Sequence, residues 1–245
     1  MISSIIFQLF KATPRIPRRI LQCTPNLLSD CRETSVPQHH YPLKLVSETP
    51  QIVNYVRVLR IELHNIQMAS NLEVIASILP MFPLLECIRL TKTFLHHIFW
   101  QEDLPQSFRT AVENCLHLPT LRMIHVDIAN FPLYLLDNNL NIDCISFSGP
   151  GRPEIPEAPH STTRFLQLRS LDVSGVRNPF RFFDSWAKQR IVKLQSLKHG
   201  YDQTVLEQIF DICSDTLINL DLEFWFLHEK VSCSTRIGTS LLNTP

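Results

Sequence analysis

A short apolar pattern recurs along most of this chain and constrains its fold more than any other feature of the sequence. The pattern is L-x-x-L-x-L, with Val, Ile or Phe replacing some leucines. Its clear copies begin at Val56, Leu85, Leu121, Ile142, Leu168 and Leu217. A weaker copy begins at Leu194, where His199 replaces the last apolar residue. Successive starts are 29, 36, 21, 26, 26 and 23 residues apart, so the copies are spaced within narrow bounds.

Each copy of the pattern predicts a β-strand. The last two apolar residues alternate with mostly polar ones, which is the period of a half-buried strand, and the first apolar residue enters the core at the turn before it. One such unit cannot bury its apolar face alone, but stacked neighbours can. Most of the steps fall in the range of roughly 20 to 29 residues that is typical of leucine-rich repeats.

The segments between the copies predict helices. Asn71 to Leu79, Pro105 to Leu118 and Thr204 to Cys213 each carry apolar residues at helical spacing. Thr204 and Glu207 have the spacing of a capping box, which predicts the start of the last of these helices. Asn178 to Lys188 is a fourth candidate, and the proline-rich stretch from Pro150 to Pro159 predicts a loop.

We therefore predict an α/β fold, an irregular leucine-rich-repeat-like solenoid over residues 45 to 230. Its parallel strands line the concave side and its helices the convex side. The solenoid is expected to be irregular because Thr93, Ala129, Val176 and Trp225 stand where regular repeats carry asparagine. Residues 1 to 44 are predicted to be a poorly defined N-terminal leader and residues 231 to 245 a C-terminal tail.

The polar residues between the strand apolars are predicted to face the concave side, where a partner would bind. Eight charged or histidine positions among them are our candidate site residues: Arg60, Glu62, Arg89, His125, Asp127, Asp172, Asp221 and Glu223. Basic residues lie early in this series and acidic residues late. This predicts a graded face on a chain whose 23 basic and 23 acidic residues balance.

Composition argues against several functions. A neutral chain has no overall field that attracts nucleic acid, and only five glycines leave little material for phosphate-binding loops, so we expect neither a nucleic-acid partner nor a cofactor. No apolar run reaches the length of a membrane span. Seven cysteines without C-x-x-C predict reduced thiols in the cytoplasm or nucleus. Residues 1 to 29, basic and acid-free, leave a mitochondrial presequence as the alternative.

Catalytic and metal-binding interpretations are weaker. Cys87 or Cys144 could act as a nucleophile with His125 as base, but the sequence nominates no orienting group or oxyanion hole. Asp172, Asp221 and Glu223 could be paired carboxylates, although spaced acids on a repeat surface are more often solvated. The adjacent residues His96 and His97 lack metal-ligand spacing. We therefore expect a protein that is not an enzyme and binds no metal.

An aromatic group near arginines offers one further alternative. Phe182 and Trp186 lie close to Arg190 in the sequence, with Phe180 and Phe183 beside them. Aromatics interleaved with basic residues can stack on single-stranded nucleic acid. At helical spacing, however, aromatics more often belong to the core, and we predict a core position for them.

The chain resembles the leucine-rich-repeat region of F-box-like proteins of mushroom-forming fungi. The likeness extends over roughly residues 45 to 225 and is carried by Thr49 to Ile61, by Trp100 to Leu121, and by Phe131 to Leu136 with the strand that ends at Ser148 and Gly149. It implies a protein–protein interaction module, a substrate receptor of an SCF-type ubiquitin ligase. The alternatives are a repeat scaffold with no ubiquitin link and, as a different class, an enzyme of unrecognised family.

The adaptor of such a ligase provides a direct test of this implication. Residues 1 to 44 contain no recognisable F-box, so they are either disordered or a degenerate remnant of one. We predict that the chain binds a Skp-type adaptor weakly or not at all. Micromolar or tighter binding in a titration with purified adaptor would contradict this prediction.

Overall fold

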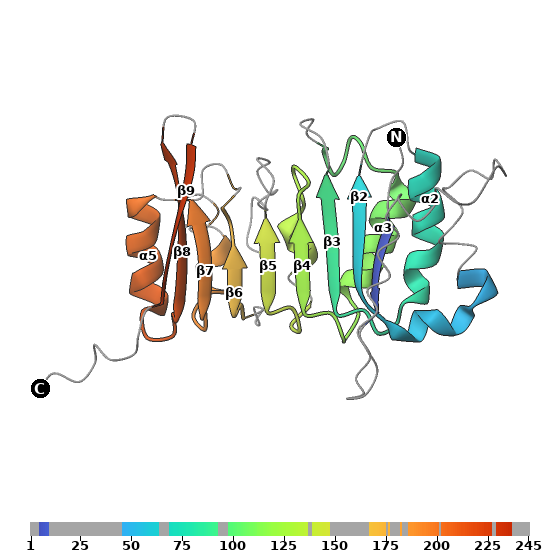
Figure 1. Cartoon of the computed structure of the whole chain (residues 1–245), viewed down its shortest axis with the longest axis horizontal. Helices are drawn as coiled ribbons and strands as arrows, with labels where there is room; N and C mark the ends of the chain where they lie inside the picture. The colour runs from blue at the N-terminus through green and yellow to red at the C-terminus, as the bar shows by residue number, and fades with distance from the viewer. Residues whose placement is uncertain are drawn as a thin grey trace, which may run out of the picture. The chain divides into compact units, whose positions relative to one another are not determined.

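The computed structural model describes residues 5–9, 46–63, 69–92, 98–136, 139–147, 167–174, 176, 182, 186–200, 202–226 and 229–236 (Figure 1). The chain divides into two compact units, Met1–Arg122 and Met123–Pro245. Both units are α/β: β2 and β3 run parallel to each other in unit 1, and β4 to β8 run parallel to one another in unit 2. The predicted α/β class with parallel strands is therefore confirmed.

Unit 1 is built on a parallel pair of strands. β2 (Val56–Leu63) pairs with β3 (Cys87–Lys92), and β1 (Ile5–Leu9) adds to β2 in the antiparallel direction. A 3-10 helix, η3 (Pro50–Tyr55), leads into β2. Further helices described in the unit include α2 (Ala69–Ile78), η5 (Leu79–Met81) and α3 (Gln106–Leu116).

In the described part of unit 2, five parallel strands follow one another in chain order. They are β4 (Met123–Val126), β5 (Cys144–Phe147), β6 (Ser170–Asp172), β7 (Ser196–Gly200) and β8 (Asn219–Phe226). β9 (Glu229–Arg236) pairs antiparallel with β8. Helices described in the unit include η6 (Leu133–Leu136) and α5 (Gln203–Cys213).

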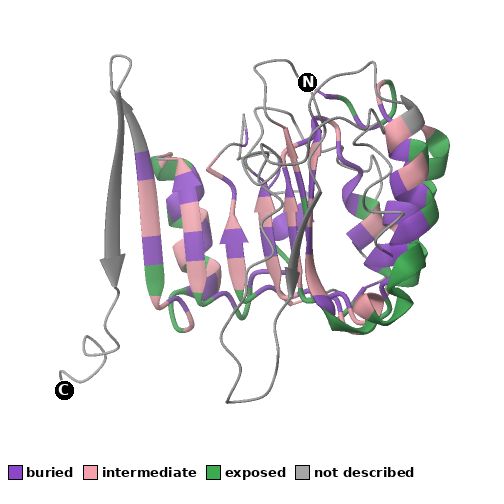
Figure 2. Cartoon of the chain, turned by 45° about the vertical axis from the view of Figure 1, so that its right-hand side comes forward, coloured by how far each residue is buried: buried purple, intermediate pink, exposed green. Residues whose placement is uncertain are grey.

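The repeat residues form the core, as the pattern predicts. The second apolar residues of the copies are direct register partners, Leu59 with Ile88 in unit 1 and Ile145 with Leu171 in unit 2. Each is at most 2% exposed. The alternation of buried and half-buried residues is visible along β7 in Figure 2. Apolar side chains therefore occupy one face of each strand, which leaves the polar series on the other.

Hydrogen bonds also join successive copies at the turn that precedes each strand. The residue after the first apolar residue repeatedly bonds to its counterpart in the previous copy: the Glu86 N–H donates to the Arg57 carbonyl, and the Arg169 N–H donates to the Asp143 carbonyl. Thr216 adds a side-chain bond of the same kind, its hydroxyl donating to the Leu194 carbonyl at 2.8 Å. Thr120 does the same to the Leu85 carbonyl at 2.8 Å. The copies are thus structurally equivalent within each unit.

Two of the predicted helices form closely as expected, with one correction at a helix start. α3 begins directly after Pro105 and buries Phe108, Val112 and Cys115. The prediction that Thr204 and Glu207 cap α5 is wrong. Asp202 is its N-cap, with its carboxylate accepting a hydrogen bond from the Val205 N–H at 3.2 Å. Asp202 precedes the predicted capping box by two residues. The Glu207 carboxylate instead accepts a hydrogen bond from the side-chain amide of Gln203.

The two antiparallel strands lie outside the repeat pattern. β1 falls within the predicted leader, and β9 crosses the predicted boundary between solenoid and tail. The predicted loop from Pro150 to Pro159 and the pair His96 and His97 lie outside the described residues, as does most of the helix predicted from Asn178 to Lys188. Among the described helices, none is both long enough and apolar enough to cross a membrane.

Candidate functional site

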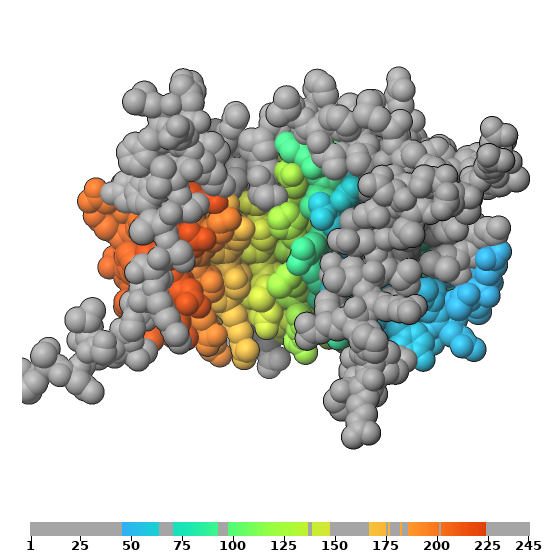
Figure 3. Space-filling view, in the orientation of Figure 1, coloured from blue at the N-terminus to red at the C-terminus, as the bar shows by residue number. Residues whose placement is uncertain are grey.

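One row of polar side chains crosses all five parallel strands of unit 2. His125, Ser146, Asp172, Lys198 and Asp221 are successive register partners from β4 to β8. Each is half-buried, and each follows a buried apolar residue, so the row lies on the strand face opposite the core. Figure 3 looks onto this face, where the described residues of β4 to β8 form a continuous surface. We call it the polar row.

Hydrogen bonds connect the first half of the polar row. The Ser146 hydroxyl donates to Asp172 Oδ2 at 3.1 Å, and His125 Nδ1 lies 2.9 Å from the same hydroxyl oxygen. Because serine has a single hydroxyl proton, Nδ1 must be the donor in its bond to Ser146. Asp172 Oδ1 accepts bonds from the Ser174 N–H at 3.1 Å and from its hydroxyl at 2.8 Å. The carboxylate is thereby fixed in position.

Lys198 lies among the carboxylates of the second half. Its Nζ is 2.9 Å from Glu223 Oε1 and 4.0 Å from Asp172 Oδ2. The hydrogen bond to Glu223 raises the pKa of Lys198, and the charges of Asp172 and Asp221 act in the same direction. Glu223 is only 2% exposed, so its carboxylate depends on this partner to offset the cost of burial. Three carboxylates surround a single ammonium group here.

The geometry of the polar row does not match nucleophilic catalysis. In a Ser-His-Asp triad the histidine accepts the serine proton and the acid orients the histidine. Here the Ser146 hydroxyl donates its hydrogen bond to Asp172, so the acid contacts the serine and not the histidine. Asp172 and Asp221 do not face each other across an open gap, since Lys198 stands between them in the register. The first four members of the row form a chain of hydrogen bonds that ends in the ion pair between Asp172 and Lys198.

The cysteine alternatives are also unfavourable. The register partner of Cys144 is Met123, and the partner of His125 is Ser146. Cys144 is therefore not directly opposite His125. Burial raises the pKa of the Cys87 thiol, although Arg89 beside it opposes the shift. A thiol with a raised pKa is a poor nucleophile. Among the described residues, no group of three or more His, Cys, Asp or Glu side chains is placed to hold a metal ion.

A second, smaller polar group lies on β2 and β3 of unit 1. Arg60 and Arg89 are direct register partners, as are Glu62 and Thr91. The Arg60 guanidinium is 3.0 Å from Glu62 Oε1, and its Nε donates to the Thr91 hydroxyl at 3.4 Å. Arg89 is exposed. Guanidinium groups therefore outnumber carboxylates in this group, the reverse of the polar row.

The predicted site residues thus divide between the units. Arg60, Glu62 and Arg89 belong to unit 1; His125, Asp127, Asp172, Asp221 and Glu223 belong to unit 2. Asp127 follows the last residue of β4. The sequence-based site set omitted Ser146 and Lys198, the two residues that connect the row. Their positions in the repeat, the same as those of His125 and Asp172, do predict that they lie on the polar face.

The aromatic group is part of the core, as predicted for its described members. Phe182 is 1% exposed and packs edge-on against Phe147, with ring centroids 5.8 Å apart. Arg190 is 4% exposed, stacks over the Trp186 ring at 4.6 Å and donates to the Trp186 carbonyl at 2.6 Å. These side chains are used within the protein and cannot stack on a nucleic-acid base. Phe180 and Phe183 lie outside the described residues.

Comparison with protein-family models, curated proteins and solved structures finds no match. The fold and the site therefore define the class of protein: an α/β chain with parallel strands, one apolar face and one polar face. No family is identified beyond that class.

Proposed function

We propose that this chain is a protein–protein interaction module, a leucine-rich-repeat-like solenoid that binds its partner on the polar strand face. The observation that carries the proposal is the polar row, in which five adjacent strands present charged and polar groups and the first four of these groups are joined by hydrogen bonds or an ion pair. Such pre-ordered groups suit recognition because little side-chain entropy remains to be lost on binding.

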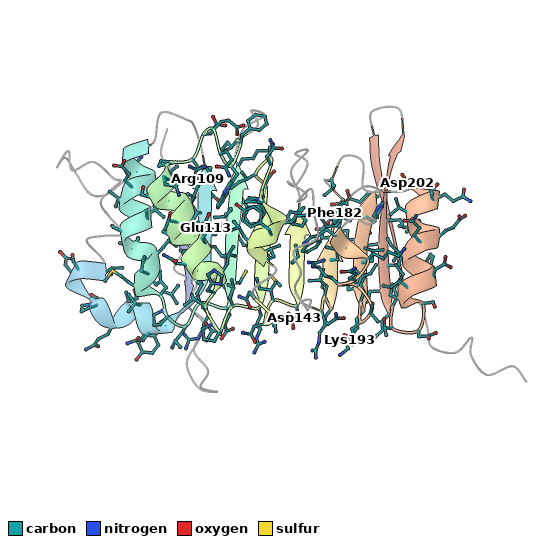
Figure 4. The ribbon with its side chains drawn as sticks, turned by 180° about the vertical axis from the view of Figure 1, so that it is seen from behind. Arg109, Glu113, Asp143, Phe182, Lys193 and Asp202 are labelled. Atoms are coloured by element: carbon teal, nitrogen blue, oxygen red, sulfur yellow. The ribbon has the colours of Figure 1, made fainter. Side chains whose placement is uncertain are left out.

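The neighbouring row of the same face supports the proposal. Cys144, Ser170, Ser196 and Asn219 are register partners one step toward the strand starts. Their small side chains leave room for an incoming segment beside the fixed charges. On α3 the polar side chains bond within the helix or to the residues just before it, as Arg109 does to Gln106 and Gln101, and these bonds do not cross successive repeats (Figure 4).

The ubiquitin link rests on the sequence resemblance. A substrate receptor of an SCF-type ligase would capture both an adaptor and a target, whereas a scaffold without that link would capture the target alone. Affinity purification of the full chain followed by mass spectrometry separates these roles. We expect a protein partner without a Skp-type adaptor, and purification that yields no specific protein partner would count against the interaction function itself.

Substitutions on the two faces then locate the binding site. Ser170→Arg and Asn219→Arg place long side chains on the strand face and should weaken binding of the purified partner by about tenfold or more, a loss of about 1.4 kcal/mol. Glu113→Lys and Glu207→Lys, on α3 and α5, are the controls and should leave affinity unchanged. Surface plasmon resonance gives the affinities, and thermal melts confirm folding. The proposal fails if the helix variants lose binding and the strand variants keep it.

A further inference from the structure

Two arginines lie directly side by side on the strand face of unit 1. Arg60 of β2 and Arg89 of β3 are register partners in a parallel ladder. Neighbouring strands are about 4.8 Å apart, so the two side chains leave the sheet close together on one face. Like charges directly opposite each other destabilise a strand pair. An anion bound between the two guanidinium groups would offset this repulsion.

The local carboxylate compensates for only one of them. Glu62 Oε1 lies 3.0 Å from Arg60, and Thr91 accepts a bond from Arg60 Nε at 3.4 Å, so the first guanidinium is held from both strands. Its side chain is nevertheless 42% exposed. Arg89 is exposed, lies beside the Cys87 thiol, and has no ion pair with any residue that the structure describes. The positive charge of Arg89 is therefore not compensated by any described carboxylate, and its side chain faces solvent.

We propose that Arg60 and Arg89 together bind a side-chain carboxylate from an acidic segment of the protein partner. The inference rests on the proposed interaction function and specifies the chemistry of one contact. A guanidinium presents donors in a fixed fork that matches a carboxylate, and two forks on adjacent strands can share its two oxygens. With Arg60 already positioned by Glu62 and Thr91, the incoming acid has to order only Arg89.

The probe for this site is a fluorescein-labelled peptide of alternating Glu and Ala, compared with its Gln and Ala counterpart. Fluorescence anisotropy with the full chain should show saturable binding of the Glu peptide only. The double variant Arg60→Gln with Arg89→Gln should weaken that binding by about tenfold or more, because charge-assisted hydrogen bonds are lost. The matched control, Arg169→Gln with Lys193→Gln, removes the same charge from exposed positions of unit 2 and should bind like the unmodified chain.

Several results would overturn the assignment. They are absence of saturable binding by the Glu peptide, equal affinity for the Gln peptide, or equal loss in the two double variants. A phosphoserine peptide or inorganic phosphate that binds at the arginine pair about tenfold more tightly than the Glu peptide would assign the site to phosphate instead. None of these results bears on the Ser170 and Asn219 variants, which test the interaction function in unit 2 with the partner itself.

Discussion

His199 occupies a position that the other copies of the repeat fill with an apolar residue. It is the third residue of the pattern in β7, and it is fully buried. Burial lowers the pKa of His199 to about 4 from the ordinary 6.5, although the charge of Asp202 opposes the shift. The imidazole is therefore neutral at physiological pH and can replace an aliphatic side chain in the core.

This burial predicts a loss of stability in mild acid. The unfolded chain takes up the His199 proton near pH 6.5 and the folded chain only near 4. Between these values the unfolded state binds more protons, so stability falls as the pH is lowered, by on the order of 3 kcal/mol in total. Denaturant melts from pH 7 to 4 should show this slope in the unmodified chain.

Two variants isolate the contribution of His199. His199→Leu should flatten the pH profile by removing the titrating group. His117→Leu, at an exposed position after α3, should leave the profile as it is. An unchanged slope in the His199 variant would show that other groups control the acid response.

At the scale of single elements, the strand phase determines which substitutions are costly. Leu171 is 1% exposed and Leu220 6% exposed, so Leu→Ala at either should cost about 2 to 5 kcal/mol of unfolding free energy. Ser170 and Asn219 point to the opposite face, and Ala at either should cost no more than about 0.5 kcal/mol. Urea melts measure the unfolding free energies of all four variants. If the Ser170 and Asn219 variants lost more stability than the leucine variants, the assignment of residues to the two strand faces would be wrong.

The start of α5 gives a second test at this scale. Asp202→Ala removes the carboxylate that accepts the Val205 N–H and should cost about 1 kcal/mol. Thr204→Ala should cost well under that, because Thr204 is exposed and lies inside the first turn. If the Thr204 variant proves the more destabilised in thermal melts, the capping box suggested by the sequence would be the true start of the helix.

At the scale of the whole molecule, local periodicity accounts for what the sequence could predict. The repeat placed Leu171 and Leu220 in the core and His125, Asp172 and Asp221 on one face, because strand period and repeat spacing together determine register. It could not place β1 or β9, whose pairing depends on contacts between distant segments. β9 does carry the alternation of Val231, Cys233 and Thr235, but that pattern lacks the repeat's leading apolar residue.

The central claim is that the polar strand face is where a protein partner binds, and site-specific photo-crosslinking tests it most directly. A benzophenone side chain at position 196 lies within the strand face, and one at position 113 lies on α3. With the partner found by affinity purification, irradiation should give a crosslinked complex from position 196 and none from position 113. Crosslinking from position 113 but not from position 196 would contradict the account, since the partner would then bind the helices.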